Sequence, residues 1–192
     1  MNKFFFPLKE GYYYGRHLNK ELKSILGNKL VQDSHATGLL SQAVANAGHG
    51  DYIEIGSLHG GSAITAALVK KVFNLTGFVF CIDPAPKGIL ENAKLFGVEE
   101  DIRVFRGTSE EYFEKVSSPF KCAFIDGDHR DPYPLEDFMK LSKVVVRYII
   151  FDDYDKSEPG VETAVRYAMD YEGLWNPVHI SNAIAIFEKI NK

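Results

Sequence analysis

The sequence predicts an α/β fold with a doubly wound, mostly parallel sheet of about seven strands and a C-terminal antiparallel hairpin. From residue 51 onward, short apolar runs alternate with stretches whose apolar residues have helical spacing. The runs are mostly apolar on both faces, as in strands that helices cover on both sides. Each intervening stretch is long enough for a right-handed crossover, so βαβ units are expected.

The elements follow in chain order. Two helices precede the sheet, over residues 16–26 and 35–47, and each is followed by a glycine that can end it. The expected strands cover residues 52–55, 78–82, 102–105, 122–125 and 148–151. The expected helices between and after them cover residues 62–73, 87–96, 110–116, 135–146 and 161–171. Residues 178–180 and 183–187 form the hairpin, because Ser181 and Asn182 leave too little chain for a parallel crossover.

Composition limits the domain organisation and the partners. The 192 residues, 45% of them hydrophobic, predict one domain over residues 1–192, with residues 1–50 as a helical extension packed on it. A net charge of -4 and the lack of any Lys/Arg run argue against a nucleic-acid partner. No apolar run approaches bilayer length, and Pro7 and Lys9 interrupt the N-terminal Phe cluster, so we expect a cytoplasmic protein without a membrane partner.

A glycine-rich segment joins the first strand to the next helix and is a candidate binding loop. Glycine lets the backbone approach a ligand closely, and the N–H groups at the helix start favour a carboxylate or phosphate. The spacing G-x-x-x-G-G differs from the dinucleotide fingerprint, and Glu54 lies just before it, which opposes a nicotinamide cofactor. A tight turn without a ligand is the alternative. The candidate residues are Gly56, Ser57, Gly60, Gly61 and Ser62.

Two acids accompany this loop. The Glu54 carboxylate is costly to bury unless a positive or donating group meets it, and the ammonium of an amino-acid ligand would do so. Asp83 ends the second strand, where its carboxylate can accept hydrogen bonds from a ribose diol. Acids end parallel strands in many α/β proteins, so Asp83 has weight only together with Glu54 and the loop.

Two later strands also end in carboxylates and predict a metal site. Asp126, Asp152 and Asp153 reach one edge of the sheet if these strands are adjacent and parallel. At an effective dielectric of about 20, two carboxylates about 4 Å apart repel by roughly 4 kcal/mol, which a cation would remove. Oxygen ligands without cysteine favour Mg²⁺ or a similar ion. Ordinary solvated strand ends or helix caps are the alternative.

Asp128 and His129 follow the first of these ligands and are the catalytic candidates. Either side chain is placed to remove a proton from a hydroxyl bound beside the metal. We favour Asp128 as the base and His129 as a group that orients or completes the ligand shell. His59, within the glycine-rich segment, is interpreted as structural.

Three motifs in order resemble the class I methyltransferases, with their Rossmann-like sheet, and within them the macrocin O-methyltransferase-like group. The likeness extends over residues 51–171. Its specific parts are the sequences IEIGS with GGS, FIDGDH, and FDDY followed by Gly160 and Val161.

The resemblance implies S-adenosylmethionine as cofactor and methyl transfer to a hydroxyl oxygen of a small molecule such as a sugar, polyol or phenol. Glu54, Gly56, Ser57 and Gly61 would contact the amino-acid end of the cofactor, Asp83 its ribose and Ser109 its adenine. Asp126, a candidate for both the cofactor and the metal, would bind Mg²⁺ together with Asp152 and Asp153. Asp128 falls where related enzymes have a proposed base.

Departures from the family bear on the acceptor and on assembly. Asp131 stands where the family usually has an aromatic residue, and the tyrosine appears at Tyr133, so the acceptor pocket is expected to be reshaped. Aromatic clusters at residues 4–6 and 12–14 are expected to tie down the terminus or to form a homodimer contact, with a substrate lid as the alternative. A cofactor-binding domain without methyl transfer and a nicotinamide oxidoreductase are the competing functions.

Overall fold

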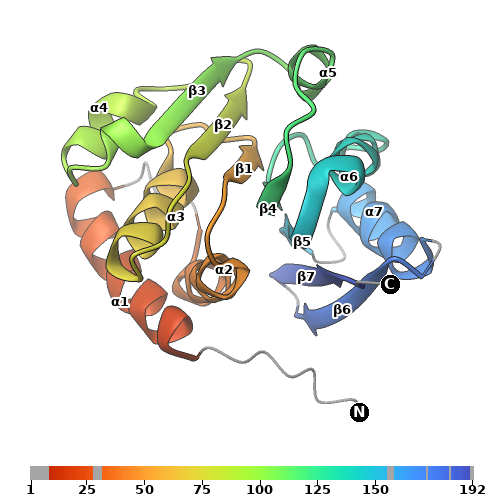
Figure 1. The fold of residues 1–192 in the computed structure, drawn as a ribbon, viewed down its shortest axis with the longest axis horizontal. Coiled ribbons are helices and arrows are strands. Elements are labelled where there is room, and N and C mark those ends of the chain that lie inside the picture. The colour runs from red at the N-terminus through yellow and green to blue at the C-terminus, as the bar shows by residue number, and fades with distance from the viewer. Residues whose placement is uncertain (1–8, 28–31, 155–157, 172, 182, 191–192) are drawn as a thin grey trace.

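The computed structural model describes residues 9–27, 32–154, 158–171, 173–181 and 183–190, so the Phe cluster at residues 4–6 and Asn182 lie outside it. A sheet has the strand order β3-β2-β1-β4-β5-β7-β6 (Figure 1). The strands are β1 (Tyr52–Ile55), β2 (Val79–Asp83), β3 (Ile102–Arg106), β4 (Phe120–Ile125), β5 (Val145–Asp152), β6 (Trp175–Ile180) and β7 (Ile184–Lys189). The first five pair in parallel, and β7 lies antiparallel between β5 and β6. The predicted fold class is confirmed.

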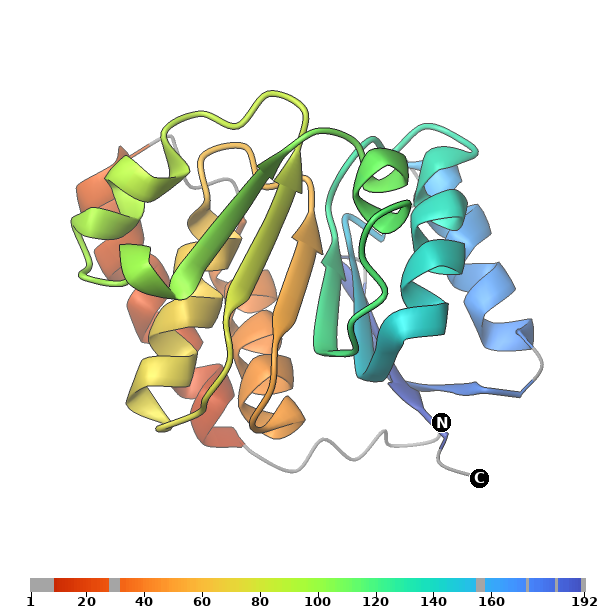
Figure 2. The same cartoon turned by 45° about the horizontal axis from the view of Figure 1, so that its top comes forward.

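Helices cover both faces of this sheet, as Figure 2 shows. They are α1 (Lys9–Leu26), α2 (Ser34–Ala47), α3 (Gly61–Val72), α4 (Ile89–Lys94), α5 (Ser109–Phe113), α6 (Tyr133–Val144) and α7 (Pro159–Asp170). Alternate strand residues enter two cores: Tyr52 packs with α1 to α4, whereas Ile53 and Ile55 pack with α5 to α7. This alternation explains why the runs are apolar on both faces.

Most element boundaries differ from the prediction by a few residues, and two of the differences have a clear physical cause. Helix α1 begins at Lys9 instead of residue 16, because Gly11 and Gly15 let it approach α2; a Cβ on Gly15 would lie 2.2 Å from Ser41 Oγ. Within the aromatic cluster of this helix, Tyr12 and Tyr14 pack against the core while Tyr13 is exposed. Val145 and the following valine belong to β5, not to the preceding helix, since Val145 is buried and pairs with Phe120.

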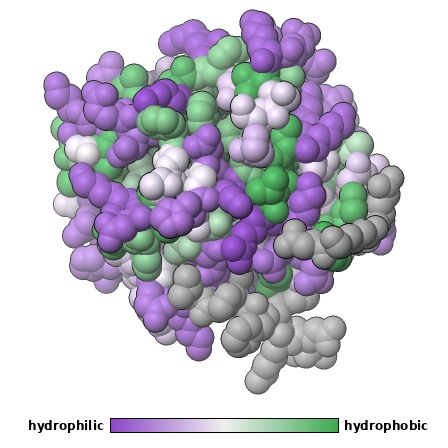
Figure 3. Space-filling model, in the orientation of Figure 1, coloured by the Kyte–Doolittle hydropathy of each residue, from purple (hydrophilic) through white to green (hydrophobic). Residues whose placement is uncertain are grey.

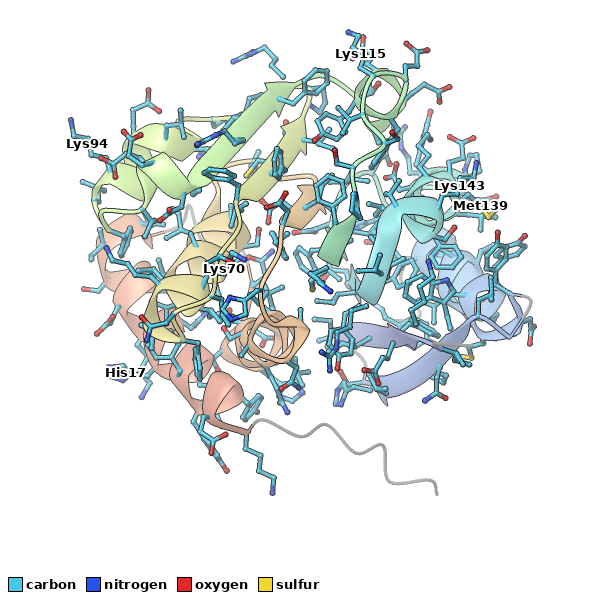
Figure 4. All side chains as sticks on the ribbon, viewed as in Figure 1. His17, Lys70, Lys94, Lys115, Met139 and Lys143 are labelled. Atoms are coloured by element: carbon cyan, nitrogen blue, oxygen red, sulfur yellow. The ribbon has the colours of Figure 1, made fainter. Side chains whose placement is uncertain are left out.

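The edge at which β1 and β2 begin is closed by structural contacts. Lys70, labelled on α3 in Figure 4, is buried, and its ammonium donates to the carbonyls of Gly50 at 2.6 Å and Thr76 at 2.8 Å. Hydrophilic residues dominate the outer surface in the view of Figure 3. Among the described helices, none has the length and apolar character needed to span a bilayer.

Candidate functional site

Four strands place the residues that end or directly follow them at the opposite edge of the sheet. Ile55 is in register with Ile82 and Ile125, and Ile125 is in register with Phe151. The next residues along these strands are Gly56, Asp83, Asp126 and Asp152. A cavity of about 600 Å³ opens at this edge, a size typical of small-molecule sites. The convergence that the sequence predicted is therefore present.

The cavity brings together most of the predicted residues. Its lining includes Gly56, Ser57, Gly61, Ser62, Asp83, Ser109, Asp126 and Asp128. Five other predicted residues are not part of the lining: Glu54, Gly60, His129, Asp152 and Asp153. Gly60 ends the loop before α3, Glu54 is fully buried, and His129, Asp152 and Asp153 lie near Asp126.

The glycine-rich segment between β1 and α3, residues 56–60, is called the glycine loop below. Gly56 has a φ of +84°, and a Cβ there would lie 1.9 Å from the carbonyl oxygen of Asp126. Glycine is therefore required for both its conformation and its close approach to the chain after β4. Gly60 precedes α3 in the left-handed region and donates its N–H to the Ser57 carbonyl at 2.6 Å.

Asp83 holds the glycine loop in place. Its Oδ2 accepts the backbone N–H groups of Ser57 at 3.0 Å and Leu58 at 2.8 Å, and its Oδ1 accepts that of Ala85 at 2.7 Å. Two carboxylate oxygens offer about four acceptor positions, so this one still has capacity for a ligand hydroxyl. In this structure, Asp83 fixes the conformation of the glycine loop, which lines the cavity.

Glu54 lies beneath the glycine loop and is fully buried. The Tyr52 hydroxyl donates to its Oε2 at 3.1 Å, while its Oε1 and the Ser57 hydroxyl have no hydrogen-bond partner among the described residues. Burial raises the pKa of Glu54 to about 7, although the nearby hydroxyls of Ser57, Ser62 and Tyr52 favour the charged form. An unpaired buried acceptor here fits the ammonium group predicted for the ligand.

Glu54→Gln is expected to stabilise the protein increasingly as the pH rises. The folded pKa of about 7 lies above the ordinary 4.5, so the folded state binds more protons between these values, and wild-type stability falls as the pH rises through that window. The free-energy advantage of the variant should grow from near zero at pH 4.5 to at most about 3 kcal/mol above pH 7. Urea unfolding of both proteins from pH 4.5 to 8 checks this, and a difference that does not change with pH would contradict it.

Asp126, His129 and Asp153 form the carboxylate–imidazole cluster, the group beside the cavity that is able to hold a metal ion. His129 Nε2 lies 3.5 Å from Asp126 Oδ1, and its Nδ1 lies 3.6 Å from Asp153 Oδ2. One ligand atom from each of the three residues lies within 4.8 Å of the others. The set combines two carboxylates with an imidazole and therefore fits a divalent cation, although its third member is His129 instead of the predicted Asp152.

Asp152 lies behind this cluster and is 6% exposed. Burial first, and then the neighbouring charges of Asp126 and Asp153, hold the pKa of Asp152 well above its usual range. Burial also raises the pKa of Asp126. The charges of Asp126 and Asp153 thus oppose ionisation of Asp152, and a cation would relieve this.

Asp128 and His129 differ strongly in their surroundings. The Arg130 side chain donates through Nε to Asp128 Oδ1 at 2.9 Å, and this pairing lowers the pKa of Asp128 to about 2. A carboxylate with so low a pKa is a weak proton acceptor at neutral pH. The Asp126 carboxylate, in contrast, raises the pKa of His129 and so favours the form that has gained a proton.

Two buried polar residues of the lining, Gln32 and Asp137, were not predicted from the sequence. Gln32 lies between the expected helices, and no local pattern singles it out. Asp137 lies on the buried face of α6, one turn from Pro134 and Leu141, and an acid on an apolar helical face was a signal that could have identified it. The Ser109 hydroxyl donates to Asp137 Oδ1, and burial raises the pKa of Asp137 to about 6.

Comparisons with known proteins identify the family and the fold. A family model described as "Methyltransferase domain" matches residues 53–154. An uncharacterised protein of Acanthamoeba polyphaga mimivirus is 30% identical over 112 residues, which make up 54% of this chain and 51% of that protein. The chain thus spans about half the length of that relative.

Solved structures share the fold over nearly the whole chain. The cofactor-bound protein Rv0187 from MTB has a TM-score of 0.69 at 16% identity, covering 93% of this chain and 89% of that one. An O-methyltransferase from Bacillus cereus in complex with SAH has a TM-score of 0.67 at 18% identity, with 96% and 93% covered. The O-methyltransferase TomG from Streptomyces achromogenes, in complex with SAM, has a TM-score of 0.63 at 16% identity, with 97% and 92% covered.

Proposed function

The chain belongs to the methyltransferase domain family, and from this premise we propose that it transfers the methyl group of S-adenosylmethionine to a hydroxyl oxygen of a small molecule. One observation gives the strongest support for the site of this reaction. Asp126 lines the cavity and also faces His129 in the carboxylate–imidazole cluster, so the cofactor space and the cation space meet at a single side chain. A sugar, a polyol or a phenol is the proposed class of acceptor.

The glycine loop side of the cavity is proposed to bind the amino-acid end of the cofactor. Ser57, Gly61 and Ser62 line it, and the unpaired Glu54 Oε1 beneath provides an acceptor for the ammonium. The N-terminal N–H groups of α3 favour the carboxylate. Asp83 is proposed to use its remaining acceptor capacity for the ribose, and Ser109 with Asp137 to bound the adenine.

The carboxylate–imidazole cluster is proposed to hold Mg²⁺ or a similar divalent cation through Asp126 and Asp153, with Asp152 contributing charge from behind. When bound, S-adenosylmethionine supplies an electrophilic methyl group, and the cation orients the acceptor hydroxyl and lowers its pKa. The chain itself positions both ligands. The glycine loop determines how deeply the cofactor binds, and the carboxylate–imidazole cluster determines where the acceptor oxygen lies. The reaction also needs a group that takes the hydroxyl proton.

His129 is proposed as that group, in place of Asp128, which the sequence alone favoured. Asp128 is committed to Arg130, whereas the imidazole lies among carboxylates that stabilise its protonated form. His129 Nε2 is buried and lies 3.5 Å from Asp126 Oδ1, beside the proposed cation site where the acceptor hydroxyl would be held. A proton taken from the hydroxyl would be held at the imidazole ring.

Calorimetric titration with S-adenosylhomocysteine, with and without Mg²⁺, tests the proposal at its base. We expect saturable binding at one site per chain, because the cavity is formed by loops that are already hydrogen-bonded. A screen of hydroxylated sugars, polyols and phenols with methyl-labelled S-adenosylmethionine then tests methyl transfer. The absence of any saturable binding would reject the proposed function.

A further inference from the structure

Gln32 is a buried amide that precedes α2 and contacts two carboxylates at the sheet edge. Its side chain lines the cavity, and the residue is 8% exposed. It lies outside residues 53–154, the part of the chain that the methyltransferase family model matches. Any role of Gln32 at the site therefore comes from the N-terminal part of the chain, in the connection between α1 and α2.

The two carboxylate oxygens of Asp126 have different partners, and the Gln32 amide is one of them. Gln32 Nε2 donates to Asp126 Oδ2 at 2.7 Å and lies 3.4 Å from Asp152 Oδ2. The other oxygen, Asp126 Oδ1, faces His129 Nε2. With Oδ2 held by the amide, Asp126 presents Oδ1 to the carboxylate–imidazole cluster, and the amide separates two carboxylates that otherwise repel.

A second buried amide holds Gln32 itself in position. Asn19, on α1 and 2% exposed, donates through Nδ2 to Thr37 Oγ1 at 2.7 Å and lies 3.4 Å from the carbonyl oxygens of Gln32 and Asp33. The Asp33 side chain accepts the N–H groups of His35 and Ala36 and so caps α2. The backbone beside Gln32 is thus tied to both N-terminal helices.

We infer that Gln32 is a positioning residue for the cation site. Its hydrogen bond to Asp126 Oδ2 orients the Asp126 carboxylate toward the carboxylate–imidazole cluster. The inference rests on the proposed function, since it assigns one residue's part in that site. Groups that hydrogen-bond to a metal ligand orient it and raise its affinity for the ion. The N-terminal helices thereby contribute to the reaction site as well as to packing.

Titration of the protein with Mn²⁺, followed by electron paramagnetic resonance of the free ion, tests this role. We expect Gln32→Met, which keeps the length of the side chain but removes the donor, to raise the Kd for Mn²⁺ about 10- to 100-fold. Gln32→Ala removes the amide without adding bulk and should weaken Mn²⁺ binding similarly. Gln42→Met makes the same chemical change at a buried position further along α2 that does not line the cavity, and should keep wild-type affinity.

Calorimetry with S-adenosylhomocysteine on the same proteins separates positioning from damage to the cavity. The variants at Gln32 should weaken binding of this ligand far less than binding of Mn²⁺, because the glycine loop is held by Asp83. Unchanged Mn²⁺ affinity in both variants would overturn the inference and leave the proposed function standing. Equal weakening of Mn²⁺ and S-adenosylhomocysteine binding would also overturn it, whereas failure of the wild-type protein to bind S-adenosylhomocysteine would reject the proposed function itself.

Discussion

Replacing His129 with glutamine is expected to lower the rate of methyl transfer by about 10²- to 10⁴-fold, the usual contribution of a positioned base. Glutamine approximates the size of histidine and can still hydrogen-bond, but it cannot take the acceptor proton. Rates measured with saturating labelled S-adenosylmethionine check the effect. The affinity for S-adenosylhomocysteine should change little, because His129 does not line the cavity.

Asp128→Asn serves as the matched comparison, since it alters the neighbouring residue that the sequence alone favoured as base. Its carboxylate is paired with Arg130 and has a pKa of about 2, so its loss should reduce the rate far less than the loss of the imidazole. If Asp128→Asn abolishes turnover while His129→Gln remains active, the base has been assigned to the wrong residue.

Gly56→Ala is expected to lower the free energy of unfolding by about 2 to 5 kcal/mol, from left-handed backbone strain combined with overpacking. The added Cβ would lie 1.9 Å from the Asp126 carbonyl oxygen and 2.6 Å from Gly127 Cα, both backbone atoms that cannot rotate away. The glycine loop and the chain after β4 must therefore separate. Urea unfolding monitored by circular dichroism measures the change.

Gly27→Ala separates the backbone strain from the overpacking. Gly27 also has a positive φ, of +58°, but a Cβ there meets no atom of the described residues within 4 Å. Its substitution should cost only about 1 to 2 kcal/mol, the left-handed penalty alone. Equal losses in the two variants would show that the close approach at Gly56 is relieved by a small movement of the chain.

The strands of the sheet, and the edge at which their carboxyl ends lie together, were predictable because they depend on local sequence. The apolar runs before Gly56, Asp126 and Asp152 are covered on both faces, so pattern alone located the strands and the edge at which they end. The hairpin was found for a similar reason: its connection is too short for any other topology.

The parts that sequence did not predict depend on contacts between distant residues. Gln32 and Asp126 are 94 positions apart, and nothing near either residue indicates their hydrogen bond. The early start of α1 depends on how closely Gly15 approaches Ser41. The low pKa of Asp128 results from the orientation of one arginine side chain, which residue order does not specify.

The hydrogen bonds from the glycine loop to Asp83 affect how a ligand would associate. A loop that must become ordered on binding loses conformational entropy at that moment, which weakens affinity and slows association. Here the backbone donors of Ser57 and Leu58 are fixed during folding by a side chain from the neighbouring strand. The protein is thus preorganised on this side of its cavity, and the ordering cost falls on folding instead of on each encounter with a ligand.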